Sequence, residues 1–320
     1  MIRPTLAALL LLTATPTVAE PPRVVTDIPP VQSITAAIMG DLGTPELVVD
    51  LAGSPHHLTL RPSDAARLND ADLLIWVGPD LTPWLEDARA SVTNSLTSLT
   101  LANADGWTPL PFREIDDFKV ADDHDHDHDH DHDHDDHDHD DHAHDHGETD
   151  PHAWLDPRVA TAWANAIAAA LSDTDPANAD AYRANAATFA NDMAALEAEL
   201  ATRAEAIRGV TYLLPHDAYQ YFEVRFDLPA TGTITFSDDA DPGPAYIAGL
   251  QDLVRDGGID CVTYAPYETQ GWVTLLTEGT EVAAHPLDQL GADLPRGPDL
   301  YPDTLRAIMT TLETCAGQGS

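Results

Sequence analysis

The sequence predicts an α/β protein made of two parallel-sheet lobes joined by one long rigid helix. Three features indicate this class. Apolar β-rich segments alternate with helical ones near the start, a second alternating series follows residue 209, and a long uninterrupted helical pattern separates the two series. About 300 residues remain after removal of a leader, which is more than one hydrophobic core usually holds. Two lobes permit a cleft between them.

The first 19 residues have the pattern of a secretory signal peptide. Arg3 precedes an apolar stretch from Leu6 to Leu12, and a segment of small residues ends at Ala19. This apolar stretch is too short for a permanent membrane helix, and no later segment approaches the roughly twenty apolar residues that a span requires. We expect residues 1–19 to be removed and the mature chain to be exported to the periplasm.

Residues 20–170 are expected to form the N-terminal lobe, because short apolar runs there alternate with helical segments as in βαβ units. The expected elements are Arg23–Thr26, Ile34–Met39, Leu47–Leu51, a helix from Ser63, and Leu73–Val77. Residues 209–320 are expected to form the C-terminal lobe by the same alternation. Its expected elements are Tyr212–Leu214, Asp217–Phe226, Gly232–Phe236, Ala245–Val254, Cys261–Tyr264 and Glu281–Ala284.

A connecting helix is expected within residues 171–208. The segment from Pro176 to Arg208 has no internal Pro or Gly, and its large apolar residues recur at helical spacing. These residues are Tyr182, Phe189, Met193, Leu196 and Leu200. A helix packed within one lobe also fits the pattern. A helix of about 30 residues spans roughly 45 Å, however, so we favour a rigid connector along both lobes.

The chain has 15 basic and 55 acidic residues, a formal net charge of −40 at pH 7. This balance argues against a nucleic-acid partner, because phosphates would be repelled at every approach. Cations are the natural partners of such a surface. Acidic surfaces also serve solubility alone, and outside the histidine-rich segment both interpretations stay open.

Only two cysteines occur, Cys261 and Cys315, in a chain that its leader directs to an oxidising compartment. The default interpretation is a disulfide. It would close a loop of roughly 55 residues and, in the chain-entropy model, add about 4 kcal/mol to the stability of the C-terminal lobe. The alternative is two free thiols acting as metal ligands, although their spacing matches no thiolate site.

Residues 122–146 alternate Asp and His with almost no apolar residue, so they cannot bury enough surface to order themselves. The sequence therefore predicts a disordered loop. Neighbouring imidazoles in it can chelate an ion, but ordering costs roughly 1–2 kcal/mol per backbone residue, so each chelate should be weak. The histidines that form these weak sites are His124, His126, His128, His130, His132, His134, His137, His139, His142, His144 and His146.

Five histidines lie outside this segment, and three of them occupy loops where an expected strand ends. His56 and His57 follow Leu47–Leu51, and His216 follows Tyr212–Leu214. Ligands of open α/β sheets bind at the carboxyl ends of strands. His152 lies between two prolines that restrict its backbone. Three imidazoles with a fourth oxygen ligand or water form a common tetrahedral zinc shell.

Four segments of the chain match one pattern in order: Gly53–Asp64, Asp70–Pro79, Asp150–Asp156 and Pro215–Glu223. Together they resemble one family, the zinc-specific solute-binding proteins of ABC importers (ZnuA-type). The likeness covers essentially the whole mature chain in order, including the acidic histidine-rich loop and the C-terminal cysteine pair.

The resemblance implies one zinc site between the lobes. It places the ligands at His56, His152 and His216, with Asp288 as the fourth ligand or a close neighbour. It also implies a high-affinity Zn(II)-binding protein of the periplasm that delivers the ion to the membrane permease of an ABC importer. Zinc is then the transported ligand and the protein is not an enzyme. We expect it to be monomeric.

Four positions differ from the family or need a separate interpretation. Gln289 stands where the family often has proline, and Ala265 replaces the usual acidic residue before a proline. These departures leave the fourth coordination position open. His57 stands where an acidic residue is frequent, and we expect it at the rim of the site. His285 lies on the last expected strand, and we expect a structural role.

Other functions stay open at this stage. A manganese- or iron-binding protein of the same fold tends to have a carboxylate in the third ligand position, where this chain has His216. Nitrogen ligands favour zinc over manganese. A secreted zinc hydrolase would need a general base beside the metal, and the chain has no His-Glu-x-x-His pattern. A zinc buffer or adhesin without transport is not excluded by the sequence.

Overall fold

The computed structural model describes residues 20–50, 53–92, 95–114, 118, 149–236 and 242–318. The expected signal peptide and the histidine-rich residues 122–146 lie outside these ranges. Within them, no helix is both long enough and apolar enough to cross a membrane.

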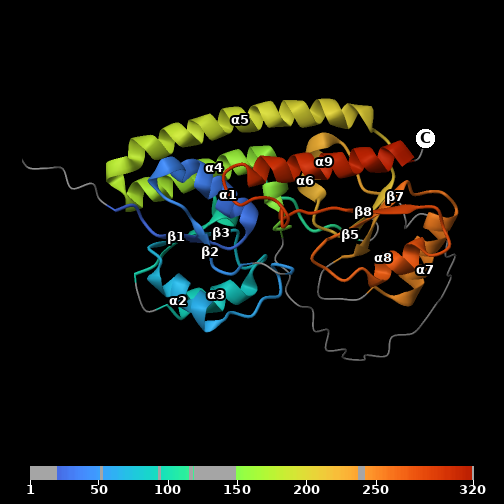
Figure 1. The fold of residues 1–320 in the computed structure, drawn as a ribbon, viewed down its shortest axis with the longest axis horizontal. Helices are drawn as coiled ribbons and strands as arrows, with labels where there is room; N and C mark the ends of the chain where they lie inside the picture. Colours follow the sequence, from blue (N-terminus) through green and yellow to red (C-terminus); the bar gives the residue numbers. More distant parts are fainter. Residues whose placement is uncertain are drawn as a thin grey trace, which may run out of the picture.

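Each lobe is built on a four-stranded sheet in which every strand pairing is parallel. The strand order is β2-β1-β3-β4 in the first sheet and β6-β5-β7-β8 in the second. Figure 1 shows the two sheets side by side, with long helices running across both. This confirms the expected class of two parallel-sheet α/β lobes.

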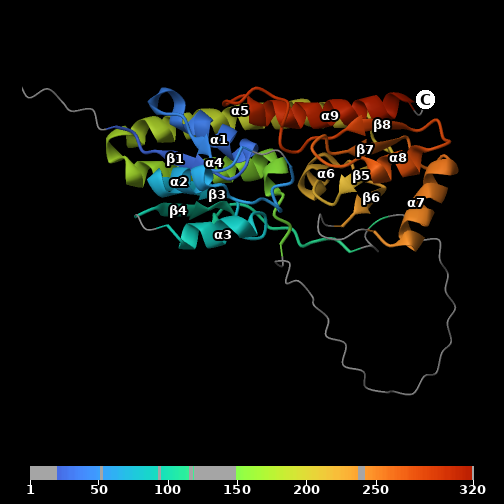
Figure 2. The same cartoon turned by 60° about the horizontal axis from the view of Figure 1, so that its bottom comes forward.

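The N-terminal lobe alternates short strands with helices, as expected of βαβ units. Its strands are β1 (Val24–Thr26), β2 (Glu46–Leu47), β3 (Leu73–Trp76) and β4 (Thr97–Thr100). Its helices are α1 (Pro29–Met39), α2 (Pro62–Asp70), α3 (Pro83–Ala90) and α4 (Pro157–Thr174). Short 3-10 turns lie at Gly40–Leu42, Leu101–Asn103 and Ala153–Leu155. All four residues of β3 are buried, as expected of a strand covered on both faces. Figure 2 shows α1 and α4 on one side of this sheet and α3 on the other.

The C-terminal lobe repeats the alternation. Its strands are β5 (Tyr212–His216), β6 (Gly232–Thr235), β7 (Cys261–Tyr264) and β8 (Ala283–Pro286), and its helices are α6 (Gln220–Phe226), α7 (Pro244–Arg255), α8 (Gly271–Thr277) and α9 (Leu300–Gln318). Ile234, Leu250 and Val262 belong to a hydrophobic cluster between the sheet and the helices α7 and α8. The opposite face of the sheet contributes Tyr212, Leu214 and Cys261 to the largest cluster.

Helix α5 (Ala179–Ala206) connects the lobes. Its 28 residues span about 42 Å, and the buried residues are those expected from the apolar spacing. The same hydrophobic cluster includes Val24 of the first lobe, Leu196 of α5 and Cys315 of α9. The core is therefore continuous along α5 from one lobe to the other, which fits a rigid connector.

Most expected elements have somewhat different bounds in the structure, and three of these differences concern the connecting helix and the strands that precede the histidines. The connecting helix begins at Ala179, after a 3-10 turn at Pro176–Asn178, and ends at Ala206. Strand β2 contains only two residues, because the chain leaves the sheet after Val48 donates its N–H to the Thr26 carbonyl. Strand β5 extends to His216, two residues further than expected. The lobe boundaries at residues 170 and 208 stay predictions.

Cys261 and Cys315 form a disulfide that joins the start of β7 to the last turns of α9. This confirms the default interpretation of the two cysteines. No free cysteine occurs among the described residues.

Candidate metal centre

His56 lies in the loop between β2 and α2. Its backbone N–H donates to Ser54 Oγ over 3.3 Å, and the preceding carbonyl of Pro55 accepts the indole N–H of Trp84 on α3 over 2.8 Å. The side chain is half-buried. The loop is therefore tied to α3 at the residue next to the histidine.

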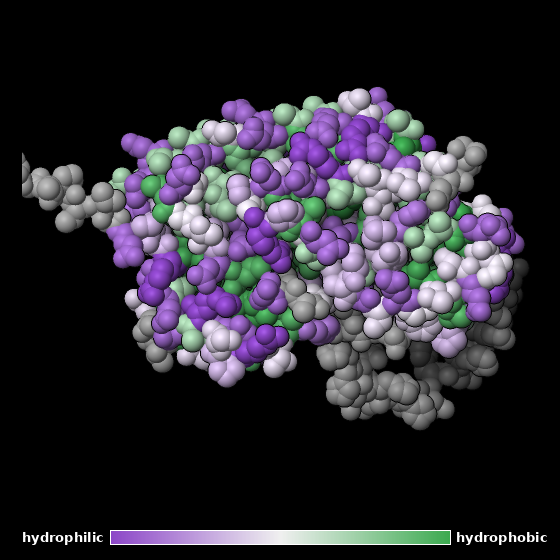
Figure 3. All heavy atoms as spheres, in the orientation of Figure 1, coloured by the Kyte–Doolittle hydropathy of each residue, from purple (hydrophilic) through white to green (hydrophobic). Residues whose placement is uncertain are grey.

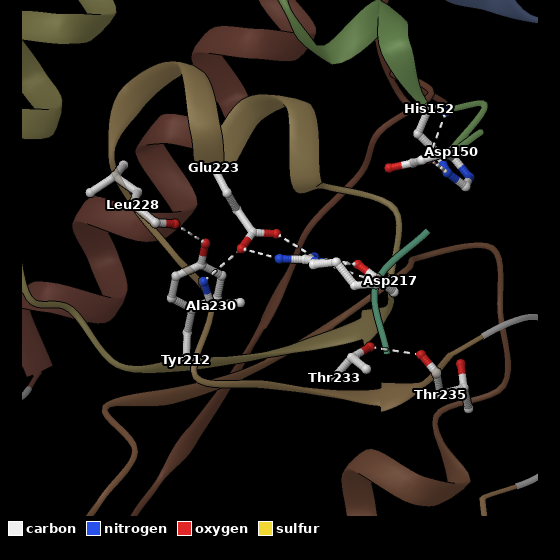
Figure 4. A network of polar contacts seen from close by, with 10 residues as sticks. Asp150, His152, Tyr212, Asp217, Glu223, Leu228, Ala230, Thr233 and Thr235 are labelled. Carbon is white, nitrogen blue, oxygen red and sulfur yellow. Dashed lines mark hydrogen bonds and ion pairs between the residues drawn. The ribbon is translucent and has the colours of Figure 1, made fainter. Parts of the chain in front are cut away.

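His152 is almost fully buried, and Asp150 holds its imidazole in place. The Asp150 Oδ1 accepts the His152 backbone N–H over 3.0 Å and approaches the ring Nδ1 to 2.8 Å (Figure 4). An ionised carboxylate only accepts hydrogen bonds, so Nδ1 carries the proton. The lone pair of His152 is then on Nε2. A carboxylate behind a histidine is the usual support of a metal-binding imidazole.

His216 is the last residue of β5, at the carboxyl end of the second sheet. Pro215 lies within the strand although it has no backbone N–H, and His216 is still paired with Thr235 of β6. The His216 Nδ1 lies 3.9 Å from Glu268 Oε1 on the loop after β7, and Nε2 lies 3.4 Å from Gln289 Nε2 on the loop after β8. Nδ1 therefore faces a carboxylate, as it does in His152.

The structure brings these three histidines together across the lobes. One nitrogen of each lies within 4.8 Å of the others, and they are the only such group of His, Cys, Asp and Glu side chains in the described ranges. His56 Nε2 and His152 Nε2 are 3.3 Å apart. Zinc–nitrogen bonds of about 2.0–2.1 Å give a tetrahedral edge of about 3.3–3.4 Å. The three imidazoles thus fit a tetrahedral metal ion.

Asp288 lies in the loop after β8 and is not a member of the three-histidine group. Its Oδ1 accepts the backbone N–H groups of Leu290 and Gly291 over 2.8 and 3.0 Å, and Oδ2 accepts that of Ala292 over 2.6 Å. Burial raises the pKa of Asp288, while these three hydrogen bonds lower it. In this structure both carboxylate oxygens hold the turn, and the role of Asp288 as a metal ligand stays a prediction.

The remaining two histidines lie apart from the group. His57 is exposed beside His56, and His285 is half-buried within β8. The register pairs His285 with Thr263 of β7.

A buried ion-pair network lies next to His216. Arg113, in the segment after β4, donates to both carboxylates of Asp217 and Glu223. Asp217 and Glu223 are labelled in Figure 4, where dashed lines mark the polar contacts of the residues drawn. Burial lowers the pKa of Arg113, but the hydrogen bonds and charges of Glu223 and Asp217 together outweigh it, so the pKa is raised. Burial raises the pKa of Glu223, although Arg113 and the N–H of Ala230 lower it. Arg113 thus fastens a segment from the first lobe to the second.

Sequence reasoning found the three histidines but missed the side chains behind them. Asp150 lies within the Asp-Pro-His motif, and its position two residues before the histidine was the available signal. Glu268 and Gln289 come from separate loops and have no comparable signal in the spacing. Gln289 was noted only as a departure from the family.

These features define a two-lobed α/β protein with an imidazole cluster between its lobes. A family model described as zinc-uptake complex component A, periplasmic (ZnuA), matches residues 24–315. The chain belongs to this family.

Among curated relatives, the high-affinity zinc uptake system protein ZnuA of Paracoccus denitrificans is 42% identical over 330 residues, covering 99% of each chain. The protein of the same name from Brucella abortus is 40% identical and covers 91% of each chain. Among solved structures, a ZnuA crystal structure superposes with a TM-score of 0.73 at 22% identity, covering 94% of this chain and 100% of the other. These comparisons agree with the observed fold.

Proposed function

We propose that this protein captures Zn(II) in the periplasm and delivers it to the membrane permease of an ABC importer, without catalysing a reaction. The observation that supports this most directly is the group of His56, His152 and His216 at the meeting point of the lobes. The relatives from Paracoccus and Brucella are both named for high-affinity zinc uptake. In this proposal zinc is the transported ligand, and the protein acts as a monomer after removal of residues 1–19.

The donor set favours zinc over manganese or iron. All three ligands in the proposed site are neutral imidazoles, whereas manganese prefers oxygen ligands. The two buried imidazoles have carboxylates at Nδ1, Asp150 at 2.8 Å and Glu268 at 3.9 Å. The hydrogen bond from Asp150 raises the basicity of the coordinating Nε2 of His152. Glu268 is too far from His216 for a hydrogen bond, but its charge offsets part of the charge of a divalent ion. A related protein of Yersinia pestis named for iron binding is 28% identical, less than the zinc-uptake relatives.

The proposed site is tested by zinc titration of the mature protein after deletion of residues 122–146. We expect one zinc to bind tightly, and His216→Ala to abolish this tight binding because it removes one of three imidazoles. His285→Ala is the matched control, since this histidine lies on β8 outside the cluster. If the deletion protein has no tight site, or if His216→Ala binds as tightly as the parent, the assignment is wrong.

Delivery is tested separately from binding. Cells that lack the chromosomal copy should take up zinc slowly at low external concentration, and the intact gene should restore uptake while the His216→Ala gene should not. Restored zinc binding in the periplasm without faster uptake would instead identify a buffer.

We further propose that the histidines of residues 122–146 collect zinc weakly and feed the tight site without forming it. The aspartates between them attract cations but also favour the protonated imidazole, so protons compete with zinc as pH falls toward about 6. Zinc stoichiometry is expected to exceed one at pH 7.5 in the intact protein and to approach one on acidification or deletion of the segment. Equilibrium dialysis measures this. A stoichiometry of one in the intact protein with excess zinc at pH 7.5 would exclude the collecting role.

A further inference from the structure

The loop after β8 places one more polar side chain against the histidine cluster. Gln289 is fully buried, at 0% exposure, and its side-chain Nε2 lies 3.4 Å from the Nε2 of His216. Its Oε1 has no hydrogen-bond partner among the residues that the structure describes. Buried side-chain oxygens nearly always have a partner, so this one indicates a group that binds there.

The backbone of Gln289 is held firmly while its side chain reaches the site. The indole N–H of Trp154 donates to the Gln289 carbonyl over 3.0 Å, which ties the loop to the first lobe. The carboxylate of Asp288 holds the following turn, in which Gly291 has a φ of +65°. The side chain of Gln289 is therefore the part of this residue that can change conformation when an ion binds.

The contact between Gln289 and His216 uses the lone pair that a metal would need. The Nδ1 of His216 lies 3.9 Å from a carboxylate oxygen of Glu268, too far for a hydrogen bond but close enough for electrostatic attraction, and on this ground we place the imidazole proton on Nδ1. Nε2 then accepts a hydrogen bond from the amide of Gln289. An amide N–H beside a cation would be repelled. A half-turn about the last side-chain bond exchanges the amide nitrogen and oxygen, and such terminal torsions have two nearly equivalent states.

We propose that the side-chain oxygen of Gln289 is the fourth ligand of the bound zinc. The terminal amide atom near His216 stands 3.4 Å from Nε2, and a tetrahedral zinc shell has edges of about 3.3–3.4 Å. The half-turn brings Oε1 to this position and gives the buried oxygen its partner. This inference rests on the proposed zinc site.

A neutral fourth ligand has a consequence for release. A carboxylate would add a charge to the shell and hold the ion more firmly, whereas an amide oxygen leaves four neutral ligands around it. Glutamate has nearly the same shape as glutamine, so Gln289→Glu changes the charge of the ligand atom with little change in volume. Gln289→Met keeps the length of the side chain but removes the amide.

The test compares these two variants in the mature protein. Zinc affinity is measured by competition with a chromophoric chelator, release by stopped-flow transfer to excess chelator, and the ligand shell by the visible absorption of the Co(II)-substituted protein. Gln251→Met on α7 is the matched control, since the amide of Gln251 donates to Leu275 of α8. Thermal melting of each metal-free variant verifies that it is folded.

We expect Gln289→Met to weaken zinc binding by at least about tenfold, by comparison with the 10–100-fold cost of losing even an outer partner of a metal site. We expect Gln289→Glu to tighten binding by about tenfold and slow release, and both variants to shift the Co(II) bands. Affinities and spectra equal to those of the parent would overturn the proposal. A folded Gln289→Glu variant that binds zinc more weakly than the parent would also overturn the proposal. If Gln289→Met does not fold, the zinc affinity of Gln289→Glu decides the test by itself. Tight binding by His216→Ala would instead reject the zinc site itself.

Discussion

Replacing Arg113 with methionine is expected to lower the free energy of unfolding by about 3–5 kcal/mol at pH 7, because it leaves buried carboxylates without their counter-charge. Asp217 and Glu223 are nearly inaccessible, and Arg113 forms side-chain hydrogen bonds to both. Methionine fills a similar space but offers no donors. Chemical denaturation followed by circular dichroism measures the loss.

The cost of Arg113→Met should depend on pH in a defined direction. Burial raises the pKa of Glu223, and Arg113 opposes this rise, so the substitution raises that pKa further. A carboxyl whose pKa is raised in the folded state contributes stability that is present at low pH and lost as pH rises through the folded pKa. The variant should therefore be least stable at neutral pH and recover part of its deficit toward pH 4–5, near the ordinary glutamate pKa of about 4.3.

Arg158→Met is the matched control for charge removal. Arg158 also pairs with a glutamate, Glu197 at 2.6 Å, but its side chain is 64% exposed. Exposed ion pairs contribute roughly 0–1 kcal/mol. If Arg113→Met and Arg158→Met lower the free energy of unfolding equally, the buried ion pairs contribute no more to stability than the exposed pair. Adding Glu223→Gln to Arg113→Met should restore part of the loss, since it removes a buried charge.

The sequence predicted secondary structure well where the apolar residues of a single element recur at regular spacing. The connecting helix followed from apolar residues such as Tyr182 and Leu196, and these are buried along α5 as expected. Helices α3, α4, α8 and α9 were not predicted. In α9, for example, Tyr301 is buried, and its hydroxyl donates to the carbonyl of Trp154, which lies 147 positions away in the sequence. Such partners are set by tertiary packing and not by local periodicity.

For the candidate site, the sequence predicted the three histidines but not the side chains around them. His56, His152 and His216 each ended an expected strand or lay in a restrained loop, and the resemblance joined them. The roles of Glu268 and Gln289 depend on how the loops after β7 and β8 turn toward β5. Asp288 and Gln289 are adjacent, and only the fold shows that the first holds the turn while the second reaches His216.

Hydrophilic side chains cover most of the described surface in the view of Figure 3, with apolar residues in scattered patches. The exposed pairs of Arg306 with Glu199 and Asp303 use some of the few basic residues on acidic neighbours. A role in solubility and a role in attracting cations both fit this surface.

Removing the disulfide by Cys261→Ala with Cys315→Ala is expected to cost about 4 kcal/mol of unfolding free energy, the chain-entropy value for a loop of this length. The bridge spans 54 positions and ties α9 to β7. With roughly 2 °C per kcal/mol expected for a chain larger than 250 residues, the melting temperature should fall by about 8 °C. Calorimetry measures this.

The same variant separates a structural disulfide from the alternative of thiol ligands. Cys261 pairs with Tyr212 at the start of β5, and His216 lies four residues further on, about 13 Å along the strand. Zinc affinity should therefore change by less than about twofold as long as the protein is folded. Thr314→Ala is the control for a change in the last turns of α9, because this exposed hydroxyl donates only within the helix. A loss of tight zinc binding at full folding would mean that the cysteines act on the metal, and an unchanged melting temperature would mean that the bridge adds no stability.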